Sequence, residues 1–131
     1  MPARSSFDYA VVRVVPRVER EEFVNAGVIL FCRTKRFLAA RVELDADRLR
    51  ALWPAVDVDE VERHLDAIPR VAAGGQDAGP IGRLPQADRF HWLTAPRSTI
   101  VQVGQIHSGL CDDPNDELEH LLDIIVRFSK A

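Results

Sequence analysis

The stretch at residues 23–32, FVNAGVILFC, decides the fold because it is apolar at nearly every position. It is too short to cross a membrane and has the length of one β-strand. Both of its faces are apolar, so we expect a central strand that is buried on both sides. Asn25 and Gly27 interrupt the run. One interpretation is a β-bulge that bends the strand, and the other is an Asn placed to hold a ligand or partner.

The segments on either side of this run predict two more strands. Residues 7–18, FDYAVVRVVPRV, alternate with a period of two, and Pro16 indicates a sheet edge or bulge at the far end. Residues 37–44, FLAARVEL, follow the polar turn RTKR. Three consecutive strands with short connections predict an antiparallel meander.

Helical periodicity begins at Asp45. Residues 45–53 predict a helix that stops before Pro54, and residues 57–68 predict a second helix that ends at Pro69. Residues 72–86 hold four of the seven glycines and two prolines, which indicates a loop. A short helix is expected at residues 86–93, QADRFHWL.

The last third of the chain predicts one late strand and one long helix. Residues 98–106, STIVQVGQI, have strand character. Residues 112–129 begin with Asp113 as the N-cap and Pro114 at the first helical position. The apolar face of this helix consists of Leu118, Leu121, Leu122, Ile125 and Phe128.

We therefore predict a single α+β domain over residues 1–131. Its antiparallel sheet is expected to have about four strands, the meander plus the late strand, with helices covering one face. No apolar run reaches ~18 residues, and the first residues lack the apolar segment of a signal peptide, so we expect a cytoplasmic protein.

The sequence predicts no cofactor and no metal site. It has no Gly-rich phosphate loop, no Gly-x-Ser-x-Gly and no His-Glu-x-x-His, and its four histidines are scattered. Cys32 and Cys111 are far apart in sequence and are expected to be free thiols. Residues 1–41 carry a net charge of +4 and the remainder −7. These parts either complement each other within the fold or leave a basic face for phosphate or an acidic partner.

Three polar groups are candidates for a binding surface. Glu22 precedes the apolar strand and Asn25 interrupts it, and Arg97 and Ser98 lie at the start of the late strand, where a guanidinium and a hydroxyl could bind an anion. Each group also has an ordinary structural interpretation, as a bulge, a strand entry or a solvated face. The third group is a set of strand arginines that would share an open sheet face: Arg13, Arg17 and Arg41.

Four blocks of the chain resemble the bacterial family of proteins of unknown function numbered 3037. They are YAVVRVVPRVEREEFVNAGVILFC, FLAARV, FHWLTAPRSTIVQ and LCDDPNDELEHLLDIIV. The specificity of this resemblance comes from four features together: Arg13, the Glu-Phe-Val-Asn-x-Gly-Val block, Pro-Arg-Ser-Thr, and the Asp-Pro before the last helix. One position departs from the family pattern, because Ala26 stands where the family usually has Val. Members of that family are often encoded beside HipA-like kinases, so the resemblance implies a small partner in a toxin–antitoxin-like pair.

Three functions remain open from the sequence. The leading hypothesis is a non-enzymatic interaction module that binds a partner protein, with a HipA-like kinase as the implied partner. The second is nucleic-acid or phosphate binding through Arg13, Arg17, Arg41 and Arg97. The third is an uncharacterised enzyme, with Glu22 or His107 as acid or base and Arg97 stabilising an anion.

Overall fold

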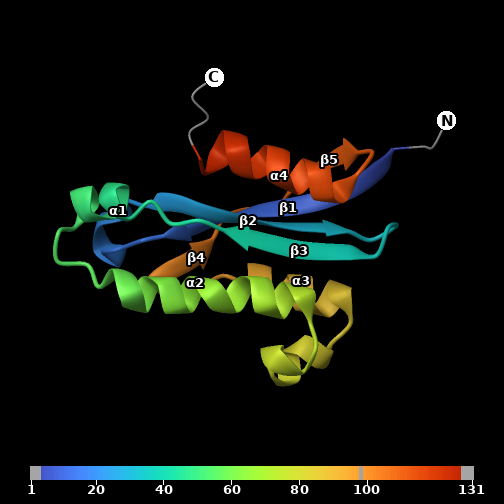
Figure 1. Ribbon diagram of the computed structural model, residues 1–131, viewed down its shortest axis with the longest axis horizontal. Helices are drawn as coiled ribbons and strands as arrows, with labels where there is room; N and C mark the ends of the chain where they lie inside the picture. Colours follow the sequence, from blue (N-terminus) through green and yellow to red (C-terminus); the bar gives the residue numbers. More distant parts are fainter. Residues whose placement is uncertain (1–3, 98, 128–131) are drawn as a thin grey trace.

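The computed structural model describes residues 4–97 and 99–127 and shows an antiparallel sheet between two helical layers (Figure 1). The meander consists of β1 (Ser5–Val14), β2 (Val24–Cys32) and β3 (Phe37–Val42). The strand order is β3-β2-β1-β4, and β5 also pairs with β1. The predicted α+β class and antiparallel meander are therefore confirmed.

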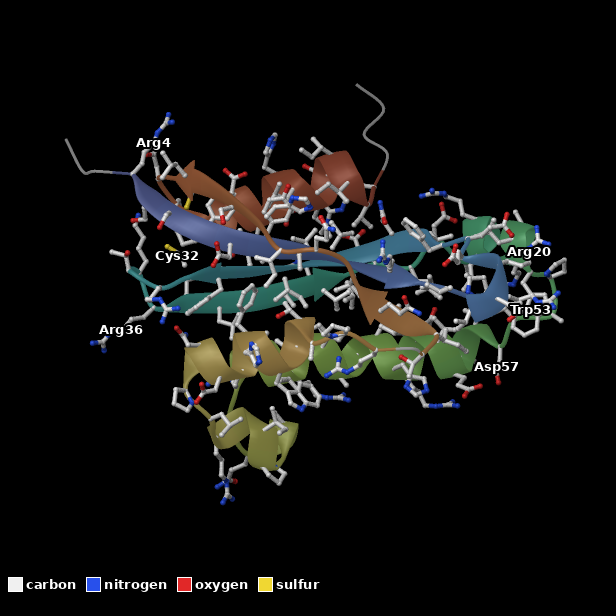
Figure 2. The ribbon with its side chains drawn as sticks, turned by 180° about the vertical axis from the view of Figure 1, so that it is seen from behind. Arg4, Arg20, Cys32, Arg36, Trp53 and Asp57 are labelled. Carbon is white, nitrogen blue, oxygen red and sulfur yellow. The ribbon has the colours of Figure 1, made fainter. Side chains whose placement is uncertain are left out.

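The predicted late strand, residues 98–106, contains only β4 (Val101–Val103), and a further strand that was not predicted, β5 (His107–Cys111), follows it; both pair with β1. Residues 104–106 lie opposite only two residues of β1, so the pairing slips by one position between the two parts. Figure 2 shows them as two orange arrows along β1, joined by a thin connection. The sheet thus has five strands where about four were expected. β5 forms an outer edge on which Leu110 is 61% exposed.

The pairing of β1 with β2 confirms the bulge interpretation. Val12 pairs with Gly27 and Arg13 pairs with Asn25, so Ala26 is the extra residue. Gly27 is required by the closeness of β3. A Cβ on Gly27 would lie 2.6 Å from the Arg41 carbonyl oxygen.

The helices begin largely where the sequence predicts. They are α1 (Ala46–Leu52), α2 (Val58–Ala73), α3 (Gln86–Thr94) and α4 (Pro114–Ile125). The N-cap carboxylates of Asp45, Asp57 and Asp113 accept hydrogen bonds from backbone N–H groups in the first turns of α1, α2 and α4.

Pro69 does not end α2, contrary to the prediction. The helix continues for one more turn because Val71 and Ala72 are buried against the core. A proline removes one helical hydrogen bond and crowds the carbonyl one turn earlier, and tertiary packing outweighs that cost here. The helix ends at Gly74, whose φ of +77° suits glycine.

The helices cover both faces of the sheet, so the expectation of one covered face is wrong (Figure 1). α2 and α3 pack on the face that carries Val12, Val14 and Ile29. α4 packs on the opposite face, against Val28 and Leu30. The physical reason is β2 itself, because a strand that is apolar on both faces needs cover on both.

The predicted loop at residues 72–86 is more ordered than its composition suggests. After α2 it contains two short 3-10 turns, Gln76–Ala78 and Pro80–Arg83. Arg89 of α3 is only 8% exposed and donates hydrogen bonds to the carbonyls of Leu84, at 2.5 Å, and Ala72, at 3.3 Å. The buried guanidinium of Arg89 therefore holds this segment against α3 through two hydrogen bonds.

Cys32 and Cys111 are free thiols, as predicted, and both are buried beneath α4. Burial, followed by the neighbouring Cys32, raises the pKa of the Cys111 thiol above its ordinary value. A raised thiol pKa means a smaller fraction of reactive thiolate. Among the described residues, no helix is long and apolar enough to span a membrane.

Candidate functional site

The C-terminal half of β1 forms the floor of an open groove that α4 does not cover. Arg13 lies on the same strand face as Phe7, which packs beneath α4. Two adjoining hollows of about 390 and 400 Å³ both include Arg13 and Phe23. We call their combined lining the Arg13 groove. Its residues are Val11, Arg13, Val15, Val18, Glu21, Phe23, Asn25, Arg97, Gln102, Gly104, Gln105 and His107.

Arg13 is the central charge of this groove. Its guanidinium carbon lies 4.6 Å from the centre of the Phe23 ring, which is a cation–π contact. Its Nε is buried without a hydrogen-bond partner, and no carboxylate in the described part of the chain forms an ion pair with it. An arginine side chain has five N–H donors, so the guanidinium can still bind an anionic group.

Apolar side chains surround this charge. Phe23 and Val18 are 44% and 43% exposed, so their apolar side chains are open to a partner. Glu21 is the acidic member of the lining, and its φ of +57° places it at the turn before β2. The groove therefore combines an unpaired cation with accessible apolar surface.

Asn25 and His107 form the wall on the side of α4 and β5. Asn25 Nδ2 lies 3.5 Å from the carbonyl oxygen of Ile125, at the end of α4. Its partner is therefore 100 residues away and not the local backbone, which corrects that part of the bulge interpretation. The His107 ring lies 5.2 Å from the Tyr9 ring. A ligand-binding role for Asn25 stays a prediction.

Three of the predicted arginine and glutamate residues lie outside the groove. Arg17 follows the end of β1 and pairs with Glu19 at 2.7 Å. Glu22 pairs with Arg20 at 2.5 Å, at the end of the molecule that carries Trp53 (Figure 2). Arg41 lies on β3 and pairs with Glu119 of α4. Ser98 lies outside the described residues.

The structure brings together only part of the acid–base set of the enzyme hypothesis. His107 and Arg97 line the two adjoining hollows of the Arg13 groove, and Glu22 lines neither of them. Among residues 4–97 and 99–127, no group of three or more His, Cys, Asp or Glu side chains is placed to hold a metal ion.

Arg97 lies at the far end of the groove and is fixed by Trp92. Its Nη2 donates to the Trp92 carbonyl oxygen at 2.8 Å, and its guanidinium lies 4.5 Å from the centre of the indole. Sequence reasoning missed both Trp92 and Phe23. A signal was present for Trp92, because it lies off the face of α3 that buries Phe90 and Leu93.

The whole of this arrangement falls within one known family. A family model described as "Protein of unknown function (DUF3037)" matches residues 9–126. The chain belongs to this family. The match runs from within β1 to the end of α4, so every residue of the Arg13 groove lies inside the DUF3037 region. No curated protein and no solved structure matches the chain.

Proposed function

We propose that this DUF3037 chain is a non-enzymatic interaction module that binds an acidic segment of a partner protein in the Arg13 groove. The observation that carries the proposal is the unpaired Arg13 stacked on the exposed Phe23. Arginine and aromatic residues are enriched where protein interfaces gain most of their binding energy.

The chemistry of the lining defines the partner segment. A carboxylate would accept charge-assisted hydrogen bonds from Arg13, with Arg97 available for a second carboxylate further along the groove. An apolar side chain of the segment would pack on Phe23 and Val18, which water now contacts. Amides of Asn25, Gln102 and Gln105 offer hydrogen bonds to a peptide backbone.

The family resemblance suggests a HipA-like kinase as the partner, in a toxin–antitoxin-like pair. The proposed setting is the cytoplasm of a bacterial cell, where Cys32 and Cys111 would stay reduced. The proposal of a binding role is further supported by the position of Glu22, which lies outside the Arg13 groove and pairs with Arg20.

The test is isothermal titration calorimetry of the purified chain with the HipA-like kinase from the same genome. Arg13→Gln and Phe23→Ser should each weaken binding about tenfold or more, because each removes a central contact. Arg17→Gln is the matched control, since Arg17 is an exposed arginine paired with Glu19 outside the groove. Proteins that never associate at micromolar concentration, or groove variants that bind as tightly as the control, would refute the proposal.

The same preparation tests the nucleic-acid alternative. Arg17 and Arg41 are already paired with Glu19 and Glu119, so only Arg13 and Arg97 of the four arginines are unpaired in the described part of the chain. Two neutralised phosphates predict a loss of roughly tenfold in affinity between 50 and 200 mM salt. A short duplex that binds with this salt dependence, when the kinase does not bind, would favour nucleic acid instead.

A further inference from the structure

A third cavity lies between α2, α3 and the segment just before β4, mainly on the side of β4 away from the Arg13 groove. Its volume is about 460 Å³, within the range of small-molecule sites. The wall is largely apolar and is formed by Ala67 and Ile68 of α2, Trp92 of α3, and Ile100 and Val101.

Among the described residues that line this cavity, Arg97 is the one with a permanent charge. Arg97 is held at the rim by its hydrogen bond to the Trp92 carbonyl and by its contact with the indole ring. No carboxylate of the described residues forms an ion pair with Arg97, so most of its N–H donors remain available.

The two other polar lining residues are less suited to hold a ligand. Thr99 Oγ1 already donates to the Val101 carbonyl at 2.7 Å. His64 is exposed at the mouth, and its Nε2 lies 3.9 Å from a carboxylate oxygen of Glu60. Recognition of a polar group therefore falls to Arg97.

The geometry points to a binding site for a small molecule with a flat apolar body and a single anionic group. The body lies between α2 and the sheet, against the Trp92 indole, and the anionic group accepts hydrogen bonds from Arg97. The apolar wall selects against a polar body, and the single cation selects against a second anionic group. This site shares Arg97 with the Arg13 groove but needs neither Arg13 nor Phe23, so variants of those two residues test the two proposals separately.

The probe is 8-anilinonaphthalene-1-sulfonate, a flat apolar molecule with one anionic group that fluoresces when it leaves water. The matched probe is N-phenyl-1-naphthylamine, which has the same rings without the sulfonate. The chain has two tryptophans, so the background variant Trp53→Phe leaves Trp92 alone as the donor for energy transfer to the bound probe.

We expect one sulfonate probe per chain, with energy transfer from Trp92. Arg97→Gln should weaken the sulfonate about tenfold or more and leave the neutral probe unchanged, because a hydrogen bond to a charged group is lost. Ala67→Phe, which fills the cavity, should weaken both probes. Arg63→Gln, an exposed arginine on α2, and Phe23→Ser, in the Arg13 groove, should leave both affinities unchanged.

Three results would overturn the inference. They are no binding of the sulfonate to the folded Trp53→Phe chain, equal loss of both probes in Arg97→Gln, and binding that Phe23→Ser abolishes. The last result would place the probe in the Arg13 groove. Circular dichroism of each variant shows that the comparison is made between folded chains.

Discussion

At the scale of single residues, Gly27 is the position where the sheet tolerates least change. We predict that Gly27→Ala destabilises the protein by roughly 1–3 kcal/mol, because a Cβ would lie 2.6 Å from a backbone oxygen of β3 and 2.8 Å from Val42 Cγ1. The free energy of unfolding in urea measures this.

Gly104→Ala is the control for that prediction. The nearest atoms to a Cβ on Gly104 lie 3.8 Å away, which is ordinary contact, so its stability should change by less than about 0.5 kcal/mol. Equal stability of the Gly27→Ala and wild-type proteins would show that β3 can move aside.

The arginines illustrate what single residues reveal before the structure is known. Strand alternation placed Arg13 on its face correctly. The pairing of Arg17 with Glu19 is local and could be read from their spacing. The partner of Arg41 is Glu119, 78 residues later, and only the packing of α4 brings the two together. Which arginine stays unpaired is therefore a tertiary property.

At the scale of elements, α4 is held to the end of β3 by an ion-pair cluster around Arg127. Arg127 pairs with Glu43 near β3, and with Glu119 at 2.5 Å and Asp123 at 2.7 Å on α4. Hydrogen bonds to Glu43 first, and then to Asp123 and Glu119, raise the pKa of Arg127 above its ordinary value. The guanidinium of Arg127 is therefore charged throughout the ordinary pH range.

We predict that Arg127→Gln lowers the Tm at low salt and that the difference shrinks in 1 M NaCl. The cluster is partly exposed, so screening weakens it, and three carboxylates lose their shared cation. Differential scanning calorimetry at both salt concentrations measures the effect.

Arg50→Gln serves as the comparison, because Arg50 forms a single exposed pair with Asp47 at 3.6 Å. Its Tm should change less than that of Arg127→Gln. A loss in Arg127→Gln that is the same at both salt concentrations would mean that packing of the arginine stem, and not charge, holds α4.

Element types were largely predictable, while their placement was not. Local signals such as the Asp57 cap and the alternation of β1 act within a few residues, so they are visible in sequence. β2 is apolar on both faces, and one helical layer can cover only one of them. The sequence of β2 therefore implied a second layer, which is α4. β5 lies beyond the predicted late strand, and its pairing depends on register against β1, which no local pattern encodes.

At the scale of the whole molecule, both helical layers rest on the same strand. Ile29 contributes to one core, and Val28 and Leu30 contribute to the other. We predict a single unfolding transition in urea, because neither core can lose β2 without exposing the other. In the Trp53→Phe chain, fluorescence of Trp92 on α3 reports the α2–α3 layer, and reaction of Cys32 and Cys111 with a thiol reagent reports the α4 layer.

The two probes should give the same urea midpoint. The buried thiols and the raised pKa of Cys111 should also make the native protein react slowly at neutral pH. Thiols that become accessible at a lower urea concentration than the fluorescence change would show that α4 detaches first.

The candidate site was predictable only in part. Arg13, Asn25, His107 and Arg97 were named from sequence and line the groove. Phe23 and Val18 were missed because exposure of an apolar side chain depends on where α4 ends, and the end of one helix is not encoded near the start of β2.

The two outer edges of the sheet differ in a way that bears on handling the protein. β3 is flanked by Lys35 and Arg36 and carries Arg41, and such charges discourage strands of other molecules from pairing there. β5 has the sequence HSGLC, which contains neither a fixed charge nor a proline, and its Leu110 is exposed. In concentrated solution, self-association would therefore start along β5, and a lysine at Leu110 is the substitution that a crystallographer would make first.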